Sequence, residues 1–294
     1  MVMYRFGFFC SKSDNSLSTN RTMNLNNLNY ENIEKKVAQN AKELIDLLEY
    51  SKSQDYPIFR LGNSFVPFIS HKLFDMGWLD KLAPIFDKTK ERLKDFDIRI
   101  TIHPGQYTVL NSPKENVIEN SLRELEMFFW LFDRLGIDDN GTVLIHGGGA
   151  YGDKVSAMER LIETIEKEDW LKQRLALEND ERVYTADEIL DVCQATKIPM
   201  VFDIYHHSLN LSEFNPKDIL KTWGNKRPKV HLSSKGEGKF GNHADYIEAK
   251  DLFELENMFT EDTKNIDIMV EAKKKELAIQ KLKENITNCN KKCS

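Results

Sequence analysis

Residues 200–207 read MVFDIYHH, and this stretch decides the fold. A short apolar run, MVF, follows Pro199, and Asp203, His206 and His207 come where the run stops. This order is typical of a buried strand whose carboxyl end carries chemistry. Because an isolated buried carboxylate is costly, we expect a cation beside Asp203. The stretch therefore predicts a strand that delivers metal ligands to one edge of a sheet.

Five other apolar runs end in the same way, each in a histidine or a carboxylate. They are RITIHPGQY, TVLIHGGG, LALENDER, VHLSS and IDIMVEAK, which deliver His103, His146, Glu178, His231 and Glu271. The carboxyl ends of the strands in a closed α/β barrel meet on one face. A single polar strand end usually marks an ordinary loop, but six of them together favour a metal centre.

Strand-like and helix-like segments alternate along the chain. We predict strands at residues 4–10, 58–62, 98–102, 143–145, 175–177, 200–202, 229–232 and 266–270. We predict helices at residues 27–50, 79–94, 116–135, 154–166, 186–195, 216–222 and 246–258. Alternating β and α units predict a parallel sheet, and the strand count fits a single-domain (β/α)₈ TIM barrel of about 250 residues. We assign residues 1–276 to this barrel and residues 277–294 to a Lys/Asn-rich C-terminal tail.

Composition narrows the classes of protein. No apolar run approaches the roughly 18 residues of a membrane span, and the N-terminus lacks the features of a secretion signal. The four cysteines, Cys10, Cys193, Cys289 and Cys293, are scattered, as in a reducing compartment. We therefore expect a soluble, cytoplasmic protein without a membrane partner. The net charge of −6 means that any contact with nucleic acid needs a local basic patch.

The residue types of the candidate ligands indicate the metal chemistry. Imidazole nitrogens mixed with carboxylate oxygens suit Mn²⁺, Zn²⁺ or Fe²⁺. The candidates are His71, His103, His146, Glu178, Asp203, His206, His231, His243 and Glu271. They exceed the needs of one ion, and clustered metals are the usual device for hydrolysing phosphodiesters. Because the set uses six of the seven histidines, we expect His207 to face away or to hydrogen-bond to a ligand from behind. In the polar loop NSLSTNRT, Arg21 is available for an anion.

Lys229 precedes His231 by two residues, and strand alternation turns both side chains to the same face. An unpaired buried lysine is rare, so one interpretation is a structural ion pair with a carboxylate. The other is a functional role, in which the amine contacts a phosphate. The sequence leaves both interpretations open.

Several motifs resemble those of the UV damage endonuclease family. They are SHKLF at 70–74, HPGQYTVLNS at 103–112, HGGGAYG at 146–152, LENDER at 177–182, FDIYHH at 202–207, RPKVHLSS at 227–234 and VEAKKKE at 270–276. The resemblance runs from about Gly7 to Glu276, which is nearly the whole chain. The chain is also distantly similar to endonuclease IV.

The resemblance implies a Mn²⁺-dependent DNA repair enzyme with a TIM barrel. Such enzymes hold two or three ions, for which Zn²⁺, Mg²⁺ or Co²⁺ can substitute. They cut the phosphodiester immediately 5′ of cyclobutane pyrimidine dimers and 6-4 photoproducts, and some members also cut at abasic sites. The implied partner is double-stranded DNA containing UV lesions, bound by a monomer located with the DNA, which means the nucleus in a eukaryote.

The resemblance also assigns roles to residues. It implies that the nine candidate ligands are metal ligands, and it places Glu178, Asp203 and Lys229 in catalysis. In some members the equivalent lysine is carboxylated and supplies an anionic group at the metals. Gln106 and Tyr107 match a pair that probes the duplex at the lesion, where stacking contributes about 1–3 kcal/mol per base.

One position departs from the family pattern. Phe8 stands where many members have tyrosine, and we expect it to contact DNA by stacking without the hydrogen bond of the hydroxyl.

Two other classes of function remain open at this point. A sugar isomerase or epimerase of the xylose-isomerase type uses a similar barrel with Glu, Asp and His on a divalent metal. It needs fewer histidines, however, and has no use for HPGQY. A lesion-binding protein without catalysis is disfavoured because the ligand set is complete.

Overall fold

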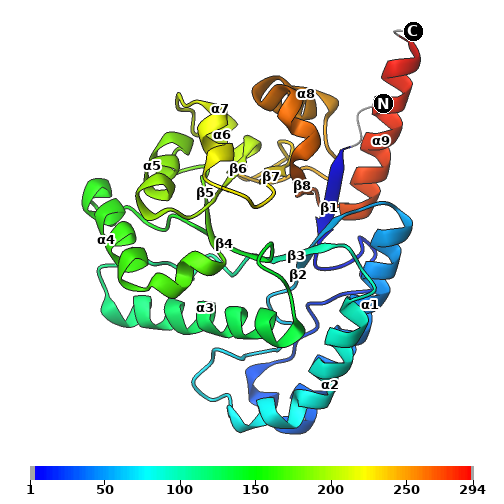
Figure 1. Cartoon of the computed structure of the whole chain (residues 1–294), viewed down its shortest axis with the longest axis vertical. Coiled ribbons are helices and arrows are strands. Elements are labelled where there is room, and N and C mark those ends of the chain that lie inside the picture. The colour runs from blue at the N-terminus through cyan, green and yellow to red at the C-terminus, as the bar shows by residue number, and fades with distance from the viewer. Residues whose placement is uncertain (1–3, 293–294) are drawn as a thin grey trace.

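Eight short parallel strands close into one barrel, because each strand pairs with the next along the chain and β8 pairs with β1. The computed structural model describes residues 4–292 (Figure 1). The strands are β1 (Arg5–Phe9), β2 (Ile58–Leu61), β3 (Arg99–Ile102), β4 (Thr142–His146), β5 (Leu175–Glu178), β6 (Met200–Asp203), β7 (Lys229–Leu232) and β8 (Asp267–Val270). This architecture confirms the predicted (β/α)₈ barrel.

Helices form the outer layer of the barrel (Figure 1). They are α1 (Tyr30–Ser53), α2 (Gly77–Leu93), α3 (Glu115–Leu135), α4 (Lys154–Lys167), α5 (Ala186–Thr196), α6 (Ile204–Leu209), α7 (Pro216–Lys221), α8 (Ala249–Phe259) and α9 (Lys275–Lys292). Short 3₁₀ turns lie at η1 (Leu25–Asn27), η2 (Asp169–Gln173) and η3 (Thr260–Asn265). The main hydrophobic core lies between the strands and this helical layer, where leucine, isoleucine and phenylalanine side chains are buried.

Capping side chains set several helix boundaries that periodicity alone misplaces. The helix expected from residue 27 begins at Tyr30, because the side chain of Asn29 accepts the backbone N–H of Asn32 at 2.9 Å. Asp203 in turn accepts the N–H of His206 at 2.9 Å and so begins α6, a helix that the sequence did not predict. The end of β6 therefore passes directly into a capped helix at the carboxyl face of the barrel.

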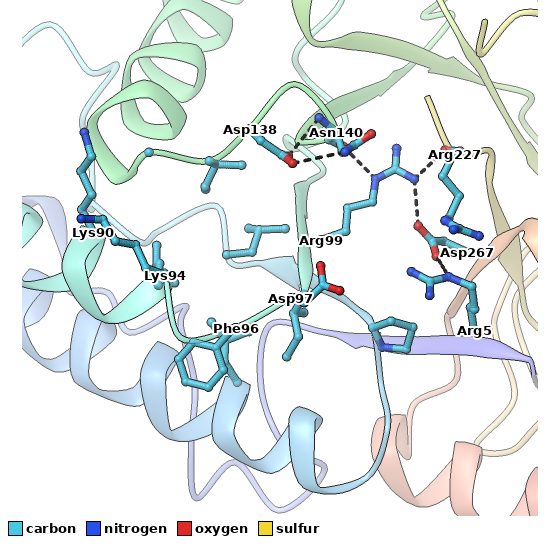
Figure 2. A pocket seen from close by; sticks show the side chains of 17 residues that line it. Arg5, Lys90, Lys94, Phe96, Asp97, Arg99, Asp138, Asn140, Arg227 and Asp267 are labelled. Atoms are coloured by element: carbon cyan, nitrogen blue, oxygen red, sulfur yellow. Dashed lines mark hydrogen bonds and ion pairs between the residues drawn. The ribbon is translucent and has the colours of Figure 1, made fainter. Parts of the chain in front are cut away.

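The opposite end of the barrel is closed by a buried ion-pair network (Figure 2). Arg5, Arg99 and Asp267 are each the first residue of a strand, so they lie at the amino-terminal face. Asp267 is fully buried and receives hydrogen bonds from Arg5 at 2.7 Å and from Arg99 at 3.0 Å. These residues line a pocket, but residues at this face of a TIM barrel usually serve stability.

The C-terminal segment is helical as far as the structure describes it. Helix α9 packs against β1 and β8 and lies beside β1 in Figure 1. Ala278, Ile279 and Leu282 are buried, so the part of the expected tail that they occupy adds to the helical layer. Cys10 and Cys193 are free thiols, whereas the side chain of Cys289 and the whole of Cys293 lie outside the described residues. None of the helices described is long and apolar enough to span a membrane.

Candidate metal centre

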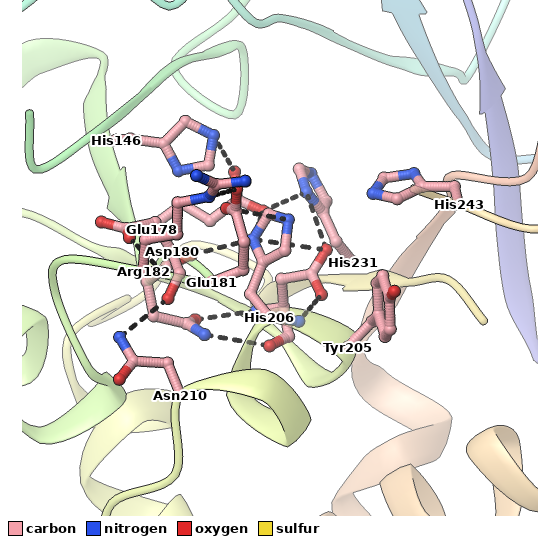
Figure 3. A network of polar contacts seen from close by, with 12 residues as sticks. His146, Glu178, Asp180, Glu181, Arg182, Tyr205, His206, Asn210, His231 and His243 are labelled. Carbon is pink, nitrogen blue, oxygen red and sulfur yellow. Dashed lines mark hydrogen bonds and ion pairs between the residues drawn. The ribbon is translucent and has the colours of Figure 1, made fainter. Parts of the chain in front are cut away.

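Six candidate ligands come from six consecutive strands and meet at the carboxyl mouth of the barrel. Figure 3 labels three of them, His146, Glu178 and His231. His146, Glu178, Asp203 and His231 lie in β4, β5, β6 and β7, and His103 and Glu271 directly follow β3 and β8. The register of the closed sheet pairs His146 with Glu178 and Asp203 with His231. The strand ends predicted from the sequence thus come together in space.

Glu178 lies at the centre of this group. Its Oε2 atom is 3.3 Å from His103 Nε2 and 3.8 Å from His146 Nε2. Its Oε1 atom is 2.6 Å from His231 Nδ1. The two oxygens of one carboxylate therefore face two different sets of imidazoles, as a bridging ligand would.

Three overlapping sets of side chains have ligand atoms close enough together to hold a metal ion. The sets are His103, His146 and Glu178; Glu178, Asp203 and His206; and Asp203, His231 and Glu271. Glu178 belongs to the first two and Asp203 to the last two. Shared carboxylates of this kind suit a cluster of adjacent ions.

The hydrogen bonding of the buried carboxylates fits a bound cation. Glu178 and Asp203 are buried, and neither Oε2 of the first nor Oδ2 of the second has a hydrogen-bond partner within the described chain. An unsatisfied buried oxygen that carries negative charge is costly. Divalent ions ligated by these oxygens would remove that cost, so the donor set fits a metal centre.

Two histidines of the centre, His103 and His206, differ in their pKa values. Burial lowers the pKa of His103 to about 4, so this imidazole is neutral near pH 7 and its lone pair is available to a metal. Burial would also lower the pKa of His206, but the carboxylates of Asp203, Glu178 and Glu271 raise it to about 9. A metal ion that binds His206 must therefore displace a proton.

Backbone carbonyls orient two of the imidazoles. Nδ1 of His206 lies 3.0 Å from the carbonyl of Asn179, and Nδ1 of His243 lies 2.7 Å from the carbonyl of Glu271. A carbonyl can only accept, so each Nδ1 carries a proton, and Nε2 is the nitrogen left for a metal, in His206 after the loss of its own proton.

Sequence reasoning missed two residues that support the centre. The amide of Asn179 donates to the carbonyl of Asp203 at 3.0 Å and accepts its N–H at 2.9 Å, which fixes this ligand. Glu181 Oε2 lies 4.0 Å from His206 Nε2 and adds a carboxylate at the rim. Both residues lie within the LENDER motif, but nothing in their spacing distinguishes them from ordinary loop residues.

The remaining histidines lie in different settings. The His243 ring lies 6.1 Å from that of His206, at the edge of the centre, and belongs to none of the three compact sets. His71 also lies outside these sets, and its Nδ1 accepts the N–H of Leu73 at 3.2 Å. The His207 ring packs on Phe202 and Phe214, so it faces away from the centre as predicted.

Lys229 is fully buried, and its Nζ has no hydrogen-bond partner among the residues described. Burial, together with the charge of Arg60, lowers its pKa to about 7. Arg60 itself donates to Glu271 Oε1 at 2.5 Å. The predicted inward direction of Lys229 is correct, but the structural ion pair considered for it is not formed.

The expected DNA contact of Phe8 is wrong. Its side chain is fully buried and packs edge-on against Tyr50, Tyr56 and Phe59, on the helix side of β1. Strand alternation turns the next residue, Phe9, inward, and its ring lies 4.8 Å from the guanidinium of Arg60. A ring buried in the core cannot stack on DNA.

Three residues expected to contact DNA lie in loops. Tyr107 is 83% exposed and Gln106 is also exposed, so both side chains are free to reach a partner. Arg21 instead forms an ion pair with Glu43 at 3.0 Å and donates to the carbonyl of Asn15 at 2.9 Å. These contacts brace the loop after β1 and neutralise the charge of Arg21.

Known proteins share this arrangement of sequence and fold. A family model described as UV-endonuclease UvdE matches residues 4–293. A UV DNA damage endonuclease of Bacillus cereus (strain G9842) is 34% identical over 259 residues, which cover 85% of this chain and 82% of the relative. One of Bacillus mycoides (strain KBAB4) is 35% identical over 252 residues, covering 83% and 80%.

Two solved structures resemble this chain in fold. The crystal structure of SacUVDE superposes with a TM-score of 0.87 at 31% identity and covers 98% of this chain and 99% of that one. A D-psicose 3-epimerase from Clostridium cellulolyticum H10 reaches a TM-score of 0.52 at 15% identity, with 78% and 79% covered. At that identity the likeness concerns the fold alone.

Proposed function

The chain belongs to the UV-endonuclease UvdE family, and from this premise we propose that it is a DNA repair endonuclease acting on UV-damaged duplexes. It hydrolyses the phosphodiester immediately 5′ of cyclobutane pyrimidine dimers and 6-4 photoproducts, with abasic sites as a further substrate. The observation that carries the proposal is the overlap of three ligand sets through Glu178 and Asp203 at the barrel mouth.

We propose that this centre holds two or three divalent ions, with Mn²⁺ preferred and Zn²⁺, Mg²⁺ or Co²⁺ as substitutes. The mixture of imidazole and carboxylate donors supports this choice. When bound, such ions would supply the Lewis-acid chemistry that activates water and stabilises charge on the leaving oxygen of the phosphodiester.

The residues of the chain have distinct tasks in this mechanism. Glu178 would hold ions through both of its oxygens, since they face different imidazoles. Asp203 joins the second set to the third and is held in place by Asn179. Because the ligands arise from the ends of paired strands, their relative positions are fixed before substrate binds.

Gln106 and Tyr107 serve lesion recognition. Their loop begins at His103, so it leaves the metal centre directly, and the exposure of both side chains supports insertion into a duplex. An aromatic ring with an adjacent amide can fill the gap left by displaced bases.

Lys229 carries a carboxylate group formed with CO₂. Its burial, its lack of a hydrogen-bond partner within the described chain and a pKa of about 7 all support a reactive neutral amine. The nitrogen lone pair forms a bond to carbon, one C=O electron pair moves to oxygen, and the amine loses a proton to solvent. The product adds a fourth anion to those of Glu178, Asp203 and Glu271.

Incision of irradiated plasmid tests the function. The full chain with Mn²⁺ should nick irradiated supercoiled DNA and leave unirradiated DNA intact, and chelation should abolish nicking. Duplexes with one dimer, one 6-4 product or one abasic site then define the lesion. Epimerisation of a ketohexose without nicking would instead select a sugar epimerase, and tight binding of damaged DNA without nicking would select a binding protein.

A further inference from the structure

The loop after β7 is an ordered hairpin that ends on a candidate metal ligand. Lys235 and His243 form an isolated antiparallel bridge, and the N–H of Gly236 donates to the carbonyl of Asn242 at 2.7 Å. Tyr205 donates to the same carbonyl at 3.1 Å. A Cβ on Gly236 would lie 2.4 Å from the carbonyl oxygen of His243, so the two arms approach as only glycine allows. We call residues 235–243 the β7 hairpin.

The tip of the β7 hairpin presents an aromatic ring beside positive charge. Phe240 is 55% exposed, and the guanidinium of Arg182 lies 5.1 Å from the centre of its ring. Arg182 is itself 62% exposed, and its Nε lies 3.4 Å from a carboxylate oxygen of Glu181. The hairpin therefore presents an exposed aromatic ring with a cation over one face.

Charge on the hairpin favours an anionic partner. Lys235 at the base of the hairpin and Lys239 next to Phe240 are both exposed, against one exposed acid, Glu237. Arg182 adds a third cation, and its guanidinium lies over the Phe240 ring. Nucleic acid offers both matching groups, because a base stacks on the ring while the phosphates next to it attract lysine and arginine.

The hairpin also lies in the right place for DNA that crosses the metal centre. His243, at its end, is anchored to the carbonyl of Glu271. Arg182 follows Glu178 by four residues, and Figure 3 labels both of them together with His243. In a closed barrel of eight strands β3 and β7 are diametrically opposite. Tyr107, in the loop after β3, and Phe240, in the loop after β7, therefore flank the centre from two sides.

We propose that the β7 hairpin is a second DNA-binding element, in which Phe240 stacks on an unpaired base and Arg182, Lys235 and Lys239 contact the adjoining phosphates. This inference rests on the proposed function, since it assigns the hairpin to the same DNA substrate. It adds a contact across the mouth from Tyr107, so that a strand with displaced bases is held at both sides of the metal centre.

Two measurements on the full chain with Mn²⁺ test the proposal. The first is steady-state incision of a duplex with one cyclobutane dimer, and the second is binding of a fluorescent single-stranded thymidine oligonucleotide. Phe240→Ala should raise the KM for incision and the Kd for the oligonucleotide by roughly five- to a hundredfold, while kcat changes by less than about twofold. Phe240→Trp should retain wild-type values, because tryptophan also stacks.

A matched control is Leu211→Ala, which removes an exposed apolar side chain from the segment after α6, outside the hairpin. It should leave both constants unchanged. Wild-type KM and Kd in Phe240→Ala would overturn the hairpin proposal while leaving the endonuclease function in place. Equal losses in Phe240→Trp and Phe240→Ala would overturn the stacking contact. A wild-type chain that neither cuts the dimer nor binds the oligonucleotide would overturn the proposed function, and the hairpin proposal with it.

Discussion

Replacing Lys229 with methionine should stabilise the metal-free protein and impair DNA incision. Lys229 is fully buried and has no hydrogen-bond partner within the described chain, and the positive charge of Arg60 lowers its pKa further. Methionine has a similar length, carries no charge and adapts to irregular core spaces. The substitution therefore removes an unfavourable buried cation but also the amine that function requires.

The size of the stabilisation follows from the pKa of Lys229. Its fall from 10.5 in an exposed lysine to about 7 in the folded protein corresponds to about 4–5 kcal/mol. The unfolded chain holds this proton more tightly, so the full free-energy penalty of burying the Lys229 ammonium applies below pH 7. It fades between pH 7 and 10.5 and vanishes above that range. The free energy of unfolding should therefore differ most between variant and wild type at acidic pH.

Urea unfolding measures this difference directly. Metal-free protein in CO₂-free buffer should show a Lys229→Met advantage of several kcal/mol near pH 6, and less than about 1 kcal/mol near pH 10. Lys35→Met, which replaces an exposed lysine of α1, is the matched control and should change stability by less than about 0.5 kcal/mol. With Mn²⁺ present, Lys229→Met should incise irradiated plasmid more slowly than the control.

Two results would contradict this reasoning. A variant that is less stable than wild type at every pH would mean that the amine makes a favourable buried contact. A constant stability difference across the pH range would mean that Lys229 does not change its protonation there. Full incision by a folded Lys229→Met protein would separately remove this residue from the catalytic set.

Three further predictions concern the metal centre and its loops. Glu178→Gln should lower incision by more than about a hundredfold without unfolding the protein, since even partners of metal ligands contribute 10- to 100-fold; undiminished cutting with Mn²⁺ by a folded variant would exclude the bridging role. Replacing Gln106 and Tyr107 together with alanine should abolish discrimination between damaged and intact duplexes at normal metal content, and a loss of bound metal would refute that assignment. Because the pKa of His206 is raised to about 9, metal uptake near pH 7 should release a proton and weaken as pH falls, which calorimetry in two buffers detects. Uptake without proton release would show that this imidazole is not a ligand.

Strand ends were the part of the site that the sequence predicted well. Apolar runs locate strands, and parallel strands in a closed barrel bring whatever follows them to one face. Four ligands could therefore be predicted to lie close together without any known distance, and the structure brings them into overlapping sets. They are His103, His146, Glu178 and Asp203. The helix boundaries shifted by a few residues, because a cap such as Asn29 has no periodic signal.

Side-chain direction within an apolar run was not predictable in the same way. In RFGFF, phenylalanine occurs at both even and odd positions, so hydrophobicity does not show which side chains of β1 point into the barrel. The assignment of Phe8 failed for this reason, while Phe9 faces Arg60. Asn179 was missed because a hydrogen bond to the backbone of another strand depends on register, which the sequence does not encode locally.

The charges inside the barrel account for the unusual state of Lys229. Glu271 is already bonded to Arg60 at 2.5 Å, and Asp267 at the opposite end is bonded to Arg99 at 3.0 Å. Two of the acids near Lys229 are thus bound by guanidinium groups, which stay charged at all relevant pH values, while Glu178 lies against His231 and His103. Both arginines then act on Lys229 as like charges and add to the effect of burial. Arg60 and Arg99, on two other strands, therefore favour the neutral amine of Lys229. Exchanging either arginine for a neutral residue would raise the pKa of Lys229, because the carboxylate of Glu271 or Asp267 would lose its partner.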